Sequence, residues 1–147
     1  MTGAAAPELA EAARDALVAA ARDAMARAYA PYSRFRVGAA LLCDDGTPEG
    51  TIVTGGNVEN ASYPASLCAE RAAVGAAVAR GLTRYRAVAV VTDADAPTPP
   101  CGMCRQVLVE FAPALRVVSE ARDGVRAEWG LDTLLPAPFD PVALLGR

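Results

Sequence analysis

Three cysteines occur where their sulfur atoms could bind one metal ion. Cys68 begins one predicted helix, and Cys101 and Cys104 begin another within a Pro-Cys-Gly-Met-Cys segment. A Cys-x-x-Cys pair at a helix N-terminus lets both sulfurs reach one ion, and the positive end of the helix dipole favours the thiolate that binds metal. Thiolates select zinc, and three protein ligands around a tetrahedral ion leave one position for water. The spacing therefore predicts a three-cysteine zinc site.

Two other interpretations of these cysteines are open at this point. A Cys-x-x-Cys pair is also the pattern of a thioredoxin-like redox site, and Cys43 could complete a structural four-cysteine zinc site. The third cysteine, at the start of a separate helix, disfavours the redox pair. Cys43 lies within a predicted strand, where we expect a small buried hydrophobic residue and not a ligand.

Glu70 lies two positions beyond Cys68 in the first turn of the same predicted helix. A carboxylate there can reach the open position of the ion, take a proton from metal-bound water and return it to a substrate. Considered alone, it would be a surface glutamate favoured by the helix dipole. Its interpretation therefore depends on the cysteines around it.

The composition removes most other kinds of catalysis. The chain has 147 residues and no histidine, and all 14 basic residues are arginine. These absences exclude Ser-His-Asp and Cys-His catalysis, two-histidine zinc sites, lysine Schiff bases and a P-loop lysine. The remaining reactive side chains are four cysteines and a set of carboxylates.

Charge and hydropathy argue against a nucleic-acid partner and a membrane span. The net charge is −3 and the pI is near 4.9, which argues against a nucleic-acid partner because phosphates need clustered positive charge. No apolar run reaches the length of about 18 to 20 residues that a membrane span needs. The first 14 residues lack the pattern of a signal peptide. We expect a cytoplasmic protein, whose thiols stay reduced.

The hydrophobic pattern predicts alternating helices and strands. Helices are expected over residues 7–30, 67–80 and 101–111, and strands over 36–43, 51–58, 87–92, 116–119 and 125–129. Pro7 suits a first helical turn, and residues 131–147 are expected to form loops or a short helical turn. One strand-helix-strand unit follows a hairpin, which predicts a mixed sheet covered by helices, an α/β sandwich. We expect a single domain over residues 1–147.

Several motifs in a fixed order resemble one known family. Cys-Ala-Glu at 68–70 is followed by Pro-Cys-x-x-Cys-Arg-Gln at 100–106, and segments 32–40, 56–63 and 134–139 match further motifs. Together they resemble the zinc-dependent cytidine deaminases of the small tetrameric, three-cysteine type. The resemblance implies a three-layer α-β-α sandwich with a mixed five-stranded sheet. It also implies a homotetramer that deaminates cytidine and 2′-deoxycytidine in pyrimidine salvage.

The same resemblance implies roles for the residues already singled out. Cys68, Cys101 and Cys104 would hold one Zn²⁺ per chain, and zinc-bound hydroxide would attack C4 of cytosine. Glu70 would accept the water proton, protonate N3 and help to deliver a proton to the departing ammonia. Zinc with three thiolates carries a formal charge of −1, and Arg71 resembles the family arginine that hydrogen-bonds ligand sulfurs and offsets this charge.

Substrate-binding residues are also implied by the resemblance. Asn57 and Glu59 match the positions that hold the ribose hydroxyls, and a free base without the sugar would leave both unpaired. Phe35 matches an aromatic residue of the substrate pocket, although core packing is an almost equal alternative. Ala69 would offer its backbone to the pyrimidine, and Phe139 matches a phenylalanine that reaches the base bound by a neighbouring subunit.

Three competing functions share parts of this pattern. A deaminase of a modified cytosine nucleoside, of the blasticidin S type, shares the cysteine motifs but not the string at 57–63. A polynucleotide-editing deaminase would need a basic path for the strand, which this acidic chain lacks. A non-catalytic, zinc-stabilised binding module would have no use for Glu70.

Overall fold

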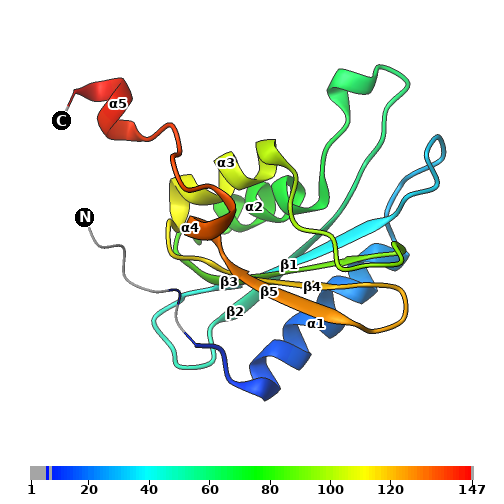
Figure 1. The fold of residues 1–147 in the computed structure, drawn as a ribbon, viewed down its shortest axis with the longest axis horizontal. Coiled ribbons are helices and arrows are strands. Elements are labelled where there is room, and N and C mark those ends of the chain that lie inside the picture. The colour runs from blue at the N-terminus through cyan, green and yellow to red at the C-terminus, as the bar shows by residue number, and fades with distance from the viewer. Residues whose placement is uncertain (1–5, 7, 147) are drawn as a thin grey trace.

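A mixed sheet of five strands lies at the centre of the computed structural model, which describes residues 6 and 8–146. The strands follow the order β2-β1-β3-β4-β5 across the sheet (Figure 1). β3 and β4 are parallel, and the other neighbouring pairs are antiparallel, so the sheet is mixed, as the sequence predicted. The strands are β1 (Val37–Cys43), β2 (Thr51–Gly56), β3 (Tyr85–Thr92), β4 (Arg116–Glu120) and β5 (Arg126–Gly130).

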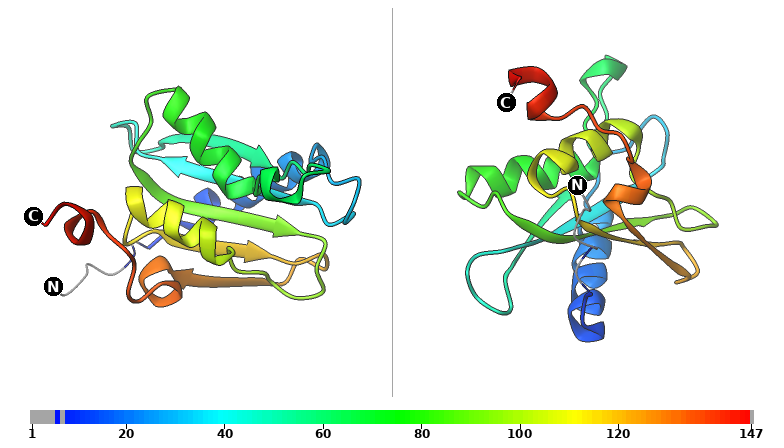
Figure 2. Two further views of the ribbon diagram at one scale, coloured as in Figure 1. Left: turned by 90° about the horizontal axis from the view of Figure 1, so that it is seen from above. Right: turned by 60° about the vertical axis from the view of Figure 1, so that its left-hand side comes forward.

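Helices cover both faces of this sheet. α1 (Glu11–Ala26) packs on one face, and α2 (Ala69–Ala79) and α3 (Gly102–Phe111) lie on the other (Figures 1 and 2). The expected three-layer α-β-α sandwich is confirmed. The described residues also form the short helices η1 (Tyr63–Ala65), α4 (Leu131–Leu134) and α5 (Pro141–Leu145). None of the helices in residues 6 and 8–146 has the length and apolar character of a membrane span.

The central strands are apolar because both of their faces are buried. Along β1, Ala39, Leu41 and Cys43 face the core beneath α2 and α3. The intervening Ala40 and Leu42 face the core beneath α1. Alternate side chains of one strand therefore belong to two different cores. This arrangement explains the continuous apolar run that the sequence shows at 87–92.

Several predicted boundaries were wrong by a few residues, and tertiary contacts explain two of the differences. α1 ends at Ala26 and not at residue 30, because Tyr29 leaves the helix to form a bridge with Val58. β3 begins at Tyr85, two residues earlier than predicted, because Tyr85 pairs with Cys43. α1 begins at Glu11, and Pro7 lies outside the described residues. Cys43 is the last residue of β1 and is fully buried.

A buried carboxylate ties α1 to the edge of the sheet. Glu120, at the end of β4, is only 3% exposed and forms an ion pair with Arg22 of α1. Its Oε2 atom also lies 2.7 Å from Nε of Arg126 on β5. Arg126 in turn reaches Asp15 of α1, with 2.5 Å between Nη1 and Oδ1. The charge of Glu120 is therefore compensated by two guanidinium groups from different elements.

We predict that Glu120→Ala lowers the free energy of unfolding by about 1–3 kcal/mol, because removing one partner of a buried ion pair leaves the other charges uncompensated. The partial exposure of Arg22 reduces the effect below that of a fully buried pair. Urea denaturation would measure the change. Glu49→Ala, at an exposed glutamate in the loop between β1 and β2, is the control. Equal stabilities of the two variants would contradict the prediction.

Candidate metal centre and active site

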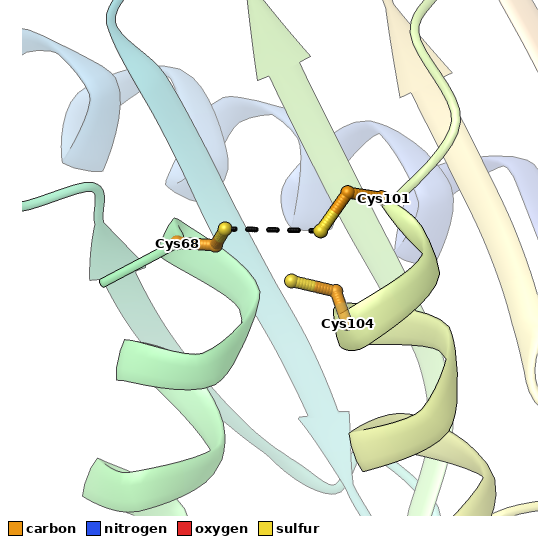
Figure 3. A group of neighbouring side chains, drawn as sticks. All are labelled: Cys68, Cys101 and Cys104. Atoms are coloured by element: carbon orange, nitrogen blue, oxygen red, sulfur yellow. Dashed lines mark hydrogen bonds between the residues drawn. The ribbon is translucent and has the colours of Figure 1, made fainter. Parts of the chain in front are cut away.

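The three predicted cysteine ligands come together where α2 and α3 begin. Cys68 is the N-cap residue of α2, and Cys101 is the N-cap residue of α3. Cys104 lies one turn further along α3, and its side chain points towards the other two (Figure 3). Neither N-cap side chain bonds the backbone of its helix, so both sulfurs can turn towards the shared point. Within residues 6 and 8–146, this is the group that could hold a metal ion.

The spacing of the sulfurs fits a tetrahedral zinc ion. Two Zn–S bonds of about 2.3 Å that meet at the tetrahedral angle place their sulfurs about 3.8 Å apart. The Sγ atoms of Cys68 and Cys101 are 3.8 Å apart, and all three Sγ atoms lie within 4.8 Å of one another. Cys43 is buried in the core at the end of β1, as expected for a hydrophobic residue, and is not part of this group.

The environment of the sulfurs favours a thiolate at Cys68. A hydrogen bond from Cys104 lowers the pKa of the Cys68 thiol to about 5, with Arg71 adding to the effect and burial opposing it. The same interaction with Cys68, together with burial, raises the pKa of Cys104. The protein itself therefore stabilises a thiolate at one of the three positions. A bound divalent cation deprotonates its thiol ligands through its own charge.

Glu70 lies beside the sulfurs and is 5% exposed. Its Oε2 atom is 3.6 Å from Sγ of Cys104, which donates to it. Burial raises the pKa of the Glu70 carboxyl, and the negative charge of Cys68 raises it further. A carboxyl with a raised pKa holds a proton more readily than an ordinary carboxyl, which suits a group that accepts a proton and passes it on. The dipole-favoured surface position considered for this residue is therefore excluded.

Arg71 points back from α2 to the cysteine cluster. Its Nη2 atom lies 3.5 Å from Sγ of Cys68 and 3.4 Å from the carbonyl oxygen of Ser66, and donates to both. The contact with the Cys68 sulfur raises the pKa of Arg71. Its buried Nε atom has no hydrogen-bond partner in the described part of the chain. Arg71 thus lies where it can offset the negative charge of a three-thiolate site, unlike an exposed helical arginine.

A cavity of about 750 Å³ opens above this cluster and could hold a small molecule. Of the predicted substrate-binding residues, Phe35, Asn57, Glu59 and Ala69 line it. Glu70 also lines the cavity, together with Cys68 and Cys101. Phe35 is 40% exposed, so it is not a core residue in this chain. The structure therefore brings Glu70, two of the three cysteines and most of the expected substrate contacts into the lining of one cavity.

Asn57 and Glu59 already have partners within the chain. The Asn57 amide accepts from the Val37 amide at 2.8 Å and donates to the Phe35 carbonyl at 2.9 Å. The Glu59 carboxylate accepts hydrogen bonds from the Tyr32 amide at 2.8 Å and from the Ser33 amide and hydroxyl. The Ser33 hydroxyl lowers the pKa of Glu59. The expectation that both side chains would be unpaired without a sugar was therefore wrong, because they hold the 32–37 segment.

Sequence reasoning missed the aromatic pair that Tyr32 and Tyr63 form at the cavity. Both residues line it, and their rings meet edge to face with centroids 6.3 Å apart. Their only signal in the sequence was membership of matched segments, with no role attached. Arg34, between Ser33 and Phe35, has a φ of 60°, an unusual conformation for a residue other than glycine. Residues 32–35, which include the cavity-lining Tyr32, Ser33 and Phe35, are thus held in a strained backbone by hydrogen bonds to Glu59 and Asn57.

Phe139 is not part of the cavity of its own chain. Its side chain is 61% exposed, and its carbonyl oxygen accepts a hydrogen bond of 2.7 Å from the Gln106 amide on α3. Arg105 donates to the carbonyl oxygens of Pro100 and Leu134, at 2.7 and 2.8 Å. The Arg-Gln pair that follows Cys104 therefore ties the chain after α4 to the helix that carries two of the cysteines.

The zinc-binding region of the cytidine and deoxycytidylate deaminases matches residues 12–120. The chain is therefore an enzyme of the zinc-dependent deaminase class, and zinc is its cofactor. The cytidine deaminase of Halalkalibacterium halodurans is 45% identical over 127 residues, covering 86% of this chain and 93% of the relative. The cytidine deaminase of Sporosarcina psychrophila is 48% identical over 124 residues, covering 84% of this chain and 88% of the relative.

Solved structures agree with the sequence relatives. The cytidine deaminase of Burkholderia pseudomallei superposes with a TM-score of 0.80 at 44% identity, covering 85% of this chain and 98% of that one. The Mycobacterium tuberculosis cytidine deaminase superposes with a TM-score of 0.73 at 43% identity, covering 86% of this chain and 96% of that one. The chain belongs to the cytidine deaminase family, which the motifs at 68–70 and 100–106 had indicated.

We predict that Cys104→Ala reduces the bound zinc to a small fraction of the wild-type amount, because two thiolates and water hold the ion much less tightly than three thiolates. Cys43→Ala is the matched control, since Cys43 and Cys104 are both fully buried. Metal analysis of the purified proteins measures zinc per chain. Full zinc content in Cys104→Ala, or equal loss in both variants, would contradict the assignment.

Proposed function

We propose that this enzyme hydrolyses cytidine and 2′-deoxycytidine to the corresponding uridines and ammonia, as a step of pyrimidine salvage. One observation carries the proposal: the buried Glu70 carboxyl lies beside the three-cysteine cluster and lines a cavity large enough for a nucleoside. The names of the relatives support the choice of substrate. The catalytic unit is the single domain expected over residues 1–147.

Glu70 is the catalytic residue of the proposed reaction. Zinc, held by Cys68, Cys101 and Cys104, supplies the chemistry that makes water nucleophilic near neutral pH. The Glu70 carboxylate accepts one proton from that water, whose oxygen bonds to C4, and delivers the proton to N3 of the cytosine ring. A second proton passes through Glu70 to the amino group at C4. The C4–N bond then breaks, ammonia leaves, and the water oxygen remains as the carbonyl oxygen of uracil.

Arg71 supports this chemistry through charge. Three thiolates give the zinc site a formal charge of −1, which weakens its ability to acidify water compared with a site of neutral ligands. Arg71 donates to the Cys68 sulfur and so withdraws electron density from one ligand. Its buried Nε is a further donor that has no hydrogen-bond partner in the described part of the chain. Arg71 is thus the residue that compensates for the absence of histidine ligands.

The cavity residues orient the nucleoside. Asn57 and Glu59 offer an amide and a carboxylate, which suit ribose hydroxyls, and the Glu59 oxygens can accept further donors beside those from Ser33 and Tyr32. Phe35 provides an apolar wall for the pyrimidine, and the Ala69 backbone can bond the base at the start of α2. A nucleoside, in which sugar and base are joined, can make both sets of contacts at once.

The proposal includes an assembly of subunits. Phe139 is held by its backbone to α3, while its ring is exposed outside the cavity of its own chain. We therefore assign it to the base bound by a neighbouring subunit of a homotetramer. A cytoplasmic location belongs to the same proposal, because the ligand thiols must stay reduced to bind zinc.

We predict that the purified protein with one zinc per chain releases ammonia from cytidine and 2′-deoxycytidine, because Glu70 and the zinc site together supply both proton transfer and the nucleophile. Ultraviolet absorbance follows the conversion of the cytosine base to uracil. Free cytosine and blasticidin S are assayed in parallel. Zinc-loaded protein that acts on blasticidin S but on neither nucleoside would replace this proposal with the modified-substrate alternative.

The Glu70→Gln variant is the control for catalysis. The amide keeps the size of the side chain but cannot accept the proton, so turnover should fall by about 10²–10⁴-fold with zinc content unchanged. Unchanged turnover in a zinc-loaded Glu70→Gln protein would exclude the proposed mechanism. A wild-type protein that binds zinc but turns over none of the nucleosides would favour the non-catalytic binding module.

We predict that Phe139→Ala leaves the tetramer intact and lowers kcat/KM for cytidine by roughly tenfold, since an aromatic contact with the base is lost. Light scattering gives the assembly, and steady-state kinetics give kcat/KM. Leu144→Ala, at another exposed apolar residue near the C-terminus, is the control and should keep wild-type kinetics. A fully active wild-type monomer would refute the role of Phe139 in a neighbouring site.

A further inference from the structure

Gly55, near the end of β2, lies directly beneath the first turn of α2. A Cβ atom placed on Gly55 would be 2.5 Å from the backbone nitrogen of Ala73 and 2.6 Å from the carbonyl oxygen of Ala69. An α-helix joins this nitrogen and oxygen by the hydrogen bond that closes one turn. Glu70 belongs to that turn, and Cys68 is its N-cap residue. The strand therefore touches the backbone that carries both groups.

The glycine is needed here for space and not for backbone conformation. Its φ is outside the left-handed region that favours glycine, whereas five other glycines of the described chain have positive φ. The two nearest atoms that a Cβ would meet are backbone atoms of α2 and the third is Cβ of Ala72, and none of them can turn aside as the end of a flexible side chain can. To restore ordinary contact, the first turn of α2 would have to move away by about 1 Å.

A displacement of that size matters for this site because its parts come from separate elements. Cys68 and Glu70 are on α2, whereas Cys101 and Cys104 are carried by α3. Metal–ligand distances tolerate only about 0.2 Å, and a misplacement of about 1 Å impairs catalysis. The same face of β2 continues two residues later to Asn57, which lines the cavity.

We infer that Gly55 is a positioning residue of the zinc site: the absence of its side chain sets how deeply the start of α2 is seated on the sheet, and thereby where Cys68 and Glu70 meet the cysteines of α3. The inference rests on the zinc site and on the proposed role of Glu70. It deepens the proposed function but does not depend on which nucleoside is the substrate.

Gly38 provides a matched control on the neighbouring strand. A Cβ atom on Gly38 would be 2.5 Å from the backbone nitrogen of Met25 and closer still to the carbonyl oxygen of Ala21, both in α1. The clash is of the same kind, since it also pushes a helix backbone away from the sheet. It falls on the opposite face, and α1 carries none of the zinc ligands.

The experiment compares zinc affinity in Gly55→Ala and Gly38→Ala by competition with a chromophoric chelator on the full chain. Thermal stability is measured for each protein with and without zinc. Both variants should be less stable than wild type. We expect Gly55→Ala to bind zinc roughly tenfold or more weakly and to gain less thermal stability from zinc, whereas Gly38→Ala keeps wild-type affinity within about twofold.

Cobalt substitution gives a readout of geometry that loss of stability alone would not change. The ligand-field spectrum of the Co²⁺-loaded protein should be altered in Gly55→Ala and unchanged in Gly38→Ala. Wild-type zinc affinity and an unaltered cobalt spectrum in Gly55→Ala would overturn the inference, and so would equal losses of affinity in both variants. Because these measurements follow metal alone, they stand apart from any failure of the enzyme to act on cytidine.

A stabilised background covers the case in which Gly55→Ala does not fold. Gly75 is exposed in the interior of α2, and an added Cβ there would have nothing within 4 Å. Gly75→Ala therefore stabilises the helix by about 0.5–1 kcal/mol. Gly55→Ala is made in this background as well. If it fails to fold in both backgrounds while Gly38→Ala folds, the inference is overturned, because Gly55 then serves the fold as a whole.

Discussion

The proposed zinc site concentrates negative charge at one point. Three thiolates and a carboxylate repel one another, and only the zinc ion and its surroundings make their approach favourable. Two helices begin at the site, so the positive ends of both dipoles point at the sulfurs. Arg71 adds a full positive charge in contact with Cys68. The rest of the fold can be understood as the framework that brings these two helix starts together.

The sheet provides that framework through its order of strands. α3 connects the parallel strands β3 and β4, while α2 follows the hairpin of β1 and β2 and leads into β3. Both helices therefore lie on one face, with their first turns side by side (Figures 2 and 3). α1 covers the opposite face, and the ion pairs of Glu120 with Arg22 and Arg126 join α1 to the sheet near its edge. Gly55, which has no side chain, lets the first turn of α2 pack closely on the sheet.

Features that depend on local rules were predictable, and those that depend on tertiary approach were not. The roles of Cys68 and Cys101 as helix starts follow from spacing and helix periodicity, and the parallel β3–β4 pair follows from the strand-helix-strand order. The partners of Asn57 could not be foreseen, because they are backbone groups some twenty residues away. The early end of α1 also depends on a distant bridge, between Tyr29 and Val58.

The bottom and the side of the cavity have different origins in the chain. The bottom of the cavity is formed by the starts of α2 and α3, which rest on the sheet, whereas much of the side is loop or short helix, including Tyr32, Ser33 and the exposed Tyr63 of η1. Changes in the side can therefore alter which molecules enter without disturbing the metal. Such a division makes the scaffold evolvable: natural selection, or a protein engineer, can explore new substrates at Tyr32 and Tyr63 while the reactive centre is inherited intact.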